Sequence, residues 1–112
     1  MDSMELQSKS NNICKAYGIP IVPIKTNNGH ARNGGLACYC SYRIRGQKRI
    51  HPKCIIVYNW FSIYNQVGEI AYVLGHELAH HILTVKKNST RHTNEHGKLS
   101  DDIAVKLSRL LK

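Results

Sequence analysis

The residues with the clearest chemical potential are His76, Glu77 and His80, which form an H-E-x-x-H motif. In a helix, a step of four residues brings two side chains to the same face, one turn apart. Two imidazoles placed in this way can bind one Zn²⁺ ion at about 2.0–2.1 Å. The glutamate beside the first histidine can then take a proton from a metal-bound water. The motif therefore predicts a hydrolytic zinc site with Glu77 as general base.

A catalytic zinc ion needs a third protein ligand and one open position. His96 is the preferred candidate, because it would share the inward stripe of a C-terminal helix with core residues. Gly97 would then let the backbone approach another helix closely. Asp101, on an adjacent face, is the main alternative. An acidic residue in the first turn of a helix can equally be there because it interacts favourably with the helix dipole. The remaining candidates are His92, Glu95 and Asp102.

The motif lies in a segment whose apolar spacing predicts a long helix, from Ser62 to about Thr84. The stripe that recurs every three or four residues consists of Val67, Ile70, Ala71, Leu74, Leu78 and Ile82. The motif histidines point away from this stripe. His81 lies about 100° around the helix from His80, so we expect it to flank the site. A final helix is predicted from about Gly97 to Leu111.

The segments upstream predict a helix and a short sheet. A first helix is expected over Glu5–Tyr17, followed by an extended segment, Ile19–Ile24, whose two prolines favour a sheet edge. The β-forming residues of Leu36–Arg45 and Cys54–Tyr58 predict two strands, joined by the basic turn Arg45–Arg49. We therefore expect one α+β domain over residues 1–112, with a three-stranded sheet between an N-terminal helix and two C-terminal helices.

The charge of the chain is strongly positive. Sixteen Lys and Arg against seven Asp and Glu give a net charge of +9 over 112 residues. Such a balance favours contact with polyanions, chiefly nucleic acid. The same charges could instead keep an edge hairpin soluble and unpaired. The candidate contact residues in the predicted hairpin are Arg43, Arg45, Lys48, Arg49 and Lys53.

Cysteine usage and hydropathy bear on where the protein works. No apolar run approaches the roughly 20 residues of a membrane span, and the N-terminus lacks the pattern of a secretory signal. We therefore expect a cytoplasmic protein with reduced thiols and no membrane contact. The one-residue spacer between Cys38 and Cys40 makes a poor zinc knuckle, so packing is the expected role of Cys14, Cys38, Cys40 and Cys54.

The motif region resembles the SprT-like zinc metallopeptidases, in which HExxH is followed by a short loop and a His-Gly pair that opens a helix. Here His76–His80 is followed, sixteen residues after His80, by His96-Gly97-Lys98. The resemblance implies a small zincin-like domain acting on proteins, in some members proteins bound to DNA. By position, it implies the zinc ligands His76, His80 and His96 and the base Glu77. Ser100 departs from the aromatic residue that this family usually has.

A second resemblance, to the ImmA/IrrE metallopeptidases, rests on other residues. Tyr17–Ile21, Ala71–Gly75 and the pattern Asp101-x-x-Ala104-x-x-Leu107 are similar to that family. Its members cleave or regulate repressor-type transcription factors. This resemblance implies Asp101 as the third ligand, where the family normally has glutamate. Both families have the same first two ligands and the same base.

The principal hypothesis is a zinc metallopeptidase that hydrolyses peptide bonds of a protein substrate. An extended substrate would pair with a strand edge beside the cleft through main-chain hydrogen bonds. The alternative is a basic module that binds nucleic acid or a repressor and whose zinc site is structural or vestigial. Loss of turnover with retained metal in Glu77→Gln would separate the two hypotheses.

Overall fold

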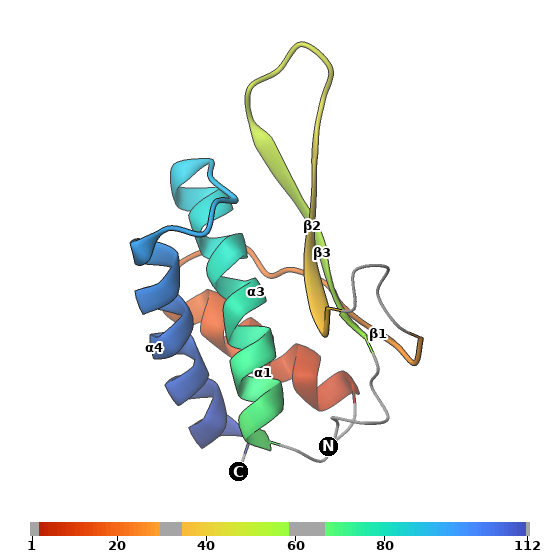
Figure 1. Cartoon of the computed structure of the whole chain (residues 1–112), viewed down its shortest axis with the longest axis vertical. Coiled ribbons are helices and arrows are strands. Elements are labelled where there is room, and N and C mark those ends of the chain that lie inside the picture. The colour runs from red at the N-terminus through yellow and green to blue at the C-terminus, as the bar shows by residue number, and fades with distance from the viewer. Residues whose placement is uncertain (1–2, 30–34, 59–66, 112) are drawn as a thin grey trace.

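The computed structural model describes residues 3–29, 35–58 and 67–111. Its elements are α1 (Ser3–Ala16), β1 (Ile24–Asn27), β2 (Ala37–Arg43), β3 (Ile50–Tyr58), α3 (Val67–Lys87) and α4 (Asn94–Leu110) (Figure 1). A helix, three strands and two further helices follow one another along the chain. The predicted α+β class and element order are therefore confirmed. No helix in these ranges is long and apolar enough to cross a membrane.

The strands form one sheet in the order β1-β3-β2, with β1 parallel and β2 antiparallel to β3. β1 pairs only with the second half of β3, from Ile55 to Tyr58. The first half of β3 and the end of β2 therefore continue as a two-stranded ribbon that projects from the body of the molecule (Figure 1). β2 is an edge strand, since no described strand pairs with its outer side.

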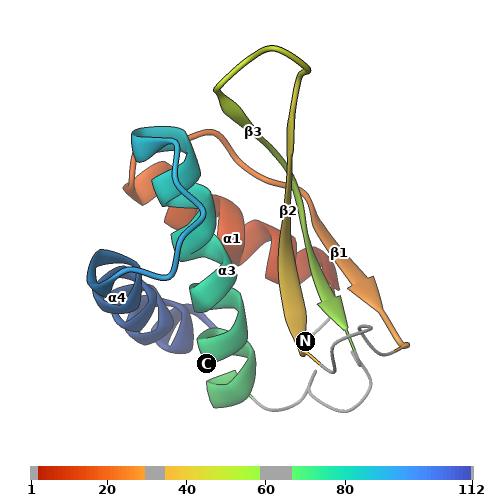
Figure 2. The ribbon, with the colours of Figure 1, turned by 45° about the horizontal axis from the view of Figure 1, so that its top comes forward.

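The helices pack as layers beside this sheet (Figure 2). α3 contacts β2 and β3, α1 contacts β1, and α4 packs along α3. Fully or almost fully buried side chains from every layer form the core, among them Leu6, Ile13, Ile55, Val57, Leu74, Leu78, Ile103 and Leu107. Burying these apolar surfaces is the main force that fixes α3 against the sheet.

Gly75 allows α4 to approach α3 closely. A Cβ atom at this position would lie 3.1 Å from the backbone nitrogen of Ala104 and 3.1 Å from the backbone oxygen of Ser100. At Gly97, a Cβ atom would meet nothing within 4 Å. The expectation that Gly97 permits a close helix approach is therefore wrong, because that glycine is exposed. The close approach occurs at Gly75, one residue before the H-E-x-x-H motif.

Two of the predicted strand segments differ from those observed, and one predicted helix start falls among residues that the structure does not describe. The segment Ile19–Ile24 is not a strand as a whole: β1 begins at Ile24, directly after Pro23, which has no N–H to donate. β3 begins at Ile50 and includes Pro52, next to a register shift between Cys40 and Ser41. Proline is tolerated there because the ribbon has only two strands, which leaves one side of each unpaired. The predicted helix start at Ser62 lies outside the described residues.

All four cysteines are free thiols. Cys14 and Cys54 are buried, which agrees with the predicted packing role, whereas Cys38 and Cys40 are half-buried on β2. The Sγ atoms of Cys38 and Cys40 lie 3.7 Å apart.

Candidate metal centre

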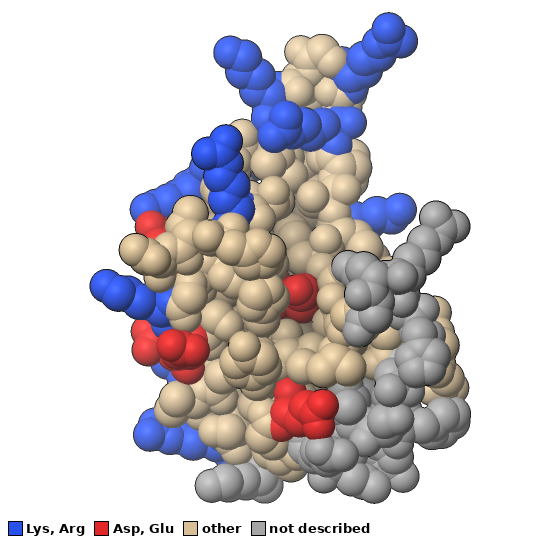
Figure 3. All heavy atoms as spheres, in the orientation of Figure 1, with Lys and Arg blue, Asp and Glu red and all other residues tan. Residues whose placement is uncertain are grey.

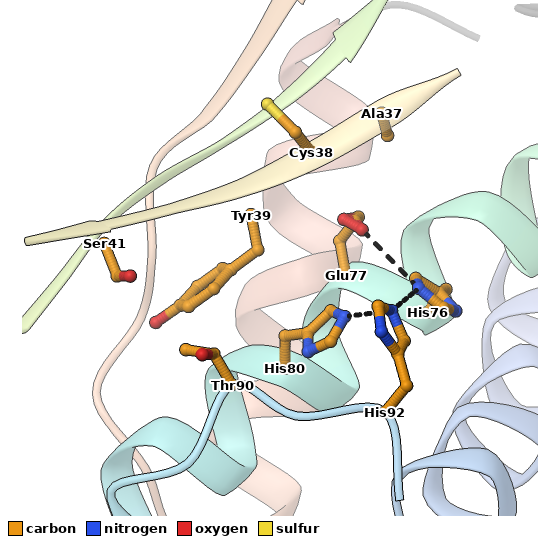
Figure 4. Close-up of a pocket in the computed structure, with 9 residues that line it drawn as sticks. All are labelled: Ala37, Cys38, Tyr39, Ser41, His76, Glu77, His80, Thr90 and His92. Carbon is orange, nitrogen blue, oxygen red and sulfur yellow. Dashed lines mark hydrogen bonds and ion pairs between the residues drawn. The ribbon is translucent and has the colours of Figure 1, made fainter. Parts of the chain in front are cut away.

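Three histidine side chains converge at the middle of α3. His76 and His80 lie one turn apart on this helix, and His92 reaches over them from the loop between α3 and α4 (Figure 4). The Nε2 atom of His92 is 3.2 Å from that of His76 and 3.1 Å from that of His80. The ligand atoms of all three residues lie within 4.8 Å of one another. This group is the candidate metal site.

The donor set fits a tetrahedral zinc ion. Bonds of about 2.0–2.1 Å at tetrahedral angles place ligand nitrogens roughly 3.3–3.4 Å apart, close to the observed separations. A ring nitrogen has either one proton or one lone pair, so Nε2 of His92 can form one good hydrogen bond but not two. A shared cation, in contrast, satisfies all three lone pairs. The convergence is therefore better explained by a metal than by hydrogen bonds among the rings.

The protonation of these histidines suits a metal ligand, which must be neutral. Burial, strengthened by the neighbouring rings of His96, His76 and His92, lowers the pKa of His80 to about 3. Burial also lowers the pKa of His76, again with a contribution from nearby imidazoles. Both rings therefore present a free lone pair at neutral pH.

Glu77 lies in the same cavity but is not one of the converging ligands. Its side chain is nearly buried, and Oε1 lies 3.9 Å from Nε2 of His76. Oε2 is buried and has no hydrogen-bond partner among the described residues. Burial raises the pKa of Glu77 to about 7. A carboxyl group with this pKa can gain and lose a proton near neutral pH.

The site opens into a polar cavity of about 400 Å³ between β2, α3 and the loop after α3. Figure 4 shows its lining, which is Ala37, Cys38, Tyr39 and Ser41 from β2, His76, Glu77 and His80 from α3, and Thr90 and His92 from the loop. His92 is exposed, and about a third of the His76 side chain is accessible. A small molecule or an extended chain can therefore reach the three nitrogens.

The group of converging ligand atoms contains His92 and not His96, the residue that the sequence predicts as the third ligand. His96 is buried, and its Nε2 lies 3.0 Å from the backbone oxygen of His76. Since a carbonyl oxygen only accepts, Nε2 of His96 donates and has no lone pair for a metal in this arrangement. The ring of His96 packs against that of His80, with 4.0 Å between centroids. His96 thus lies behind the group, and His92 supplies its third nitrogen.

The start of α4 explains this exchange. Thr93 caps the helix: its Oγ1 accepts a hydrogen bond of 3.1 Å from the backbone N–H of His96. α4 therefore begins at Asn94, three residues before the predicted Gly97. His96 then lies in the first turn, facing α3, while His92 stays in the preceding loop. Recognising Thr93 as a helix cap would have been the sequence signal for this arrangement.

The acidic candidates lie away from the three nitrogens. Asp101 and Asp102 are exposed on α4 and do not belong to the group of converging ligand atoms. Glu95 forms an ion pair with Lys87, with 2.6 Å between Oε2 and Nζ. None of these carboxylates is therefore placed as a ligand.

His81 is outside the metal group, as expected, but its role is more than flanking. It is fully buried, with Nε2 2.8 Å from the backbone oxygen of Pro20 and Nδ1 3.1 Å from the hydroxyl of Tyr39. Because the carbonyl must accept, Nε2 carries the proton and Nδ1 accepts from Tyr39. The Tyr39 ring also stacks near His80, at 6.3 Å between centroids. This network holds β2 beside the metal ligands.

Comparison with protein-family models, with curated proteins and with solved structures found no match to this chain. The geometry of the site therefore carries the functional argument, and that geometry is a three-histidine group that can hold a metal ion.

Proposed function

We propose that this protein is a zinc-dependent peptidase. The observation that carries the proposal is the convergence of three Nε2 atoms, from His76, His80 and His92, with a nearly buried carboxylate from Glu77 beside them. Three nitrogen ligands leave one position of a tetrahedral ion open, as catalytic zinc sites require. A structural site would more commonly have four protein ligands.

The residues of the chain divide the chemistry among them. Bound Zn²⁺ supplies Lewis acidity, which lowers the pKa of water and polarises a carbonyl group. The Glu77 carboxylate accepts the proton of the attacking water and can then deliver it to the leaving amine. Its nearly buried position, with Oε1 3.9 Å from Nε2 of His76, places it beside the three nitrogens for both steps. His96 fixes the His76 turn by donating to its carbonyl.

The edge strand favours a peptide as the substrate. The segment of β2 from Ala37 to Ser41 borders the metal cavity, and the outer side of β2 has no described strand partner. An extended peptide can add to such an edge through main-chain hydrogen bonds, which bring its carbonyl groups past the metal with little demand on sequence.

A smaller pocket next to the metal gives the proposal a side-chain preference. Its volume is about 250 Å³, and it is lined by Leu36, Ala37, Tyr72, Val73, His76 and Glu77. Leu36 and Tyr72 are among the exposed large hydrophobic residues of the molecule. We expect this pocket to accept an apolar side chain next to the scissile bond.

The test compares Glu77→Gln with Glu69→Gln, which makes the same change on the same helix away from the cavity. The substrate is an unfolded, fluorescently labelled protein, and bound zinc is measured in parallel. We expect Glu77→Gln to keep its zinc and to lose about 10²–10⁴-fold in rate, the usual contribution of a general base. Glu69→Gln should cleave normally. Equal cleavage by both variants, or zinc binding without cleavage by the unmodified protein, would contradict the proposal.

A further inference from the structure

The two-stranded ribbon formed by residues 41–53, here called the basic ribbon, concentrates positive charge at one end of the molecule. Residues 41–49 are all exposed. The cations of the ribbon are Arg43, Arg45, Lys48, Arg49 and Lys53. Figure 3 shows Lys and Arg side chains spreading from this end, while the acidic side chains visible on this face lie lower on the molecule. The end of the molecule formed by the ribbon is therefore strongly basic and carries no visible acid on this face.

Nothing in the described structure neutralises these cations. The sequence has no Asp or Glu from residue 6 to residue 68, so the ribbon and its neighbours in the chain contain no acid. Lys87 does form an ion pair with Glu95, but these two residues lie on α3 and α4. Uncompensated charges this close together repel one another, and an anionic partner would relieve that repulsion.

The ribbon is held in a fixed direction by Asn88, at the C-terminal end of α3. The Asn88 Oδ1 atom accepts from the N–H of Ile50 at 2.6 Å, and its Nδ2 donates to the carbonyl of Lys48 at 3.1 Å. Asn88 adopts a positive φ of 53°, which asparagine tolerates better than most residues. At the tip, a turn is closed by Gln47 N–H and Ile44 O, with Gly46 at φ 84°. The cations are therefore presented on a pre-organised frame, which lowers the entropic cost of binding.

A polar cavity lies where the ribbon meets the loop after α3. Its volume is about 290 Å³, and its lining is Arg43, Ile50, Asn88, Ser89, Thr90 and Arg91. Two arginines and two residues with hydroxyl groups thus border one small space. Planar, forked guanidinium donors match the oxygens of a phosphate group, and hydroxyl groups add further donors. The cavity extends the anion-binding surface from the ribbon to the body of the domain.

We propose that the basic ribbon and Arg91 bind the phosphodiester backbone of duplex DNA, with the ribbon in the major groove. The major groove of B-form DNA is wide enough for a two-stranded β-ribbon. The major groove of A-form RNA is deep and too narrow for side chains to read. Tyr42 and Ile44, about half exposed on the ribbon, are placed to contact sugar and base edges.

The test measures binding of a fluorescent 20-base-pair DNA duplex by anisotropy over a range of salt concentrations. The test variant carries Arg45→Ala, Lys48→Ala and Arg49→Ala. Its matched control carries Lys15→Ala, Lys98→Ala and Arg109→Ala, which removes the same charge from exposed positions on α1 and α4. Zinc content and thermal unfolding of each protein show that the fold is intact. Hydrolysis is not part of the measurement, so Glu77→Gln should bind DNA normally.

For the ribbon variant we expect affinity to fall tenfold or more at 100 mM salt. The slope of log K against log salt should become shallower by about 0.9 for each phosphate that the variant no longer neutralises. Arg91→Ala should reduce the slope by the amount expected for a single phosphate. The control variant should stay within about threefold of the unmodified protein. Equal reductions of affinity in both triple variants would mean that net charge alone drives binding and would overturn the proposal. An RNA duplex of the same sequence bound as tightly as the DNA would also overturn it.

Discussion

The Oγ1 atom of Thr93 accepts a hydrogen bond of 3.1 Å from the backbone N–H of His96, and this contact decides which histidine joins His76 and His80. It starts α4 at Asn94 and turns the His96 side chain toward the carbonyl of His76. His92 is left in the loop, with its Nε2 facing those of His76 and His80. The cap thus assigns two histidines of similar spacing to different roles.

The different roles of His92 and His96 predict different responses to glutamine. His92→Gln should lower zinc affinity by at least a hundredfold, because an amide is a poor replacement for a ligating imidazole. His96→Gln should bind nearly as well as the unmodified protein, since its amide can still donate to the His76 carbonyl. His96→Ala should bind zinc more weakly than His96→Gln, because the His76 carbonyl loses its side-chain donor. Competition with a chromophoric zinc chelator measures each affinity. If His96→Gln lost zinc affinity and His92→Gln kept it, His96 and not His92 would be the ligand.

Gly75 and Gly68 offer a matched pair on α3. At Gly75 a Cβ atom would crowd two backbone atoms of α4 at 3.1 Å, whereas at Gly68 it would meet nothing within 4 Å. Alanine is favoured over glycine in helices by about 1 kcal/mol, but overpacking costs about 1–3 kcal/mol. We therefore expect Gly75→Ala to lower the free energy of unfolding by about 1 kcal/mol and Gly68→Ala to raise it. Urea denaturation measures both, and stabilisation by both substitutions would show that α4 does not sit this close.

Asn88 combines a left-handed backbone with two hydrogen bonds to the ribbon, and two variants separate these contributions. Asn88→Gly keeps the backbone conformation and removes the bonds, each worth about 0.5–1.5 kcal/mol. Asn88→Ala also adds the strain of a left-handed residue, about 1–2 kcal/mol. Chemical denaturation should therefore rank alanine below glycine, and glycine below the unmodified protein. We call the two hydrogen bonds from Asn88 to the ribbon the clamp. If both variants were as stable as the unmodified protein, the clamp would contribute nothing to stability.

The sequence predicts α3 and the proximity of His76 and His80 because both depend on local periodicity. Apolar spacing locates the helix, and the four-residue step places His76 and His80 together. The third histidine of the group depends on the cap at Thr93, and a difference of three residues at the start of α4 is enough to exchange His96 for His92 there. The sequence predicts the close helix contact at Gly97, whereas it occurs at Gly75. The spacing of residues within one helix does not show which of its faces packs against a second helix.

Long-range contacts are beyond the reach of sequence spacing. His81 bonds to Pro20, 61 residues earlier in the chain, and to Tyr39 on β2. The position of His81 around α3 predicts that its side chain points away from His76 and His80. Its contacts with Pro20 and Tyr39 are visible only in the folded structure. The clamp between Asn88 and the ribbon joins residues about 40 positions apart and escapes prediction for the same reason.

The buried thiol of Cys14 predicts a loss of stability at alkaline pH. Burial raises the pKa of Cys14 above its ordinary value of 9.0, so the folded thiol stays neutral while the unfolded one ionises. The unfolded state therefore loses protons first, and stability falls as pH rises above 9, by up to about 1.4 kcal/mol per pH unit. Cys14→Ala removes this contribution. Its free energy of unfolding, although lower at pH 8, should decline less steeply than that of the unmodified protein between pH 9 and 10.5; parallel curves would contradict the assignment.

X-ray absorption at the zinc edge of the zinc-loaded protein tests the metal centre itself. The predicted spectrum has three imidazole nitrogens at about 2.0–2.1 Å and one oxygen from solvent, and in His92→Gln only two of the three imidazoles should remain. A sulfur neighbour at about 2.3 Å, or a spectrum that His92→Gln leaves unchanged, would show that the ion is held elsewhere in the chain.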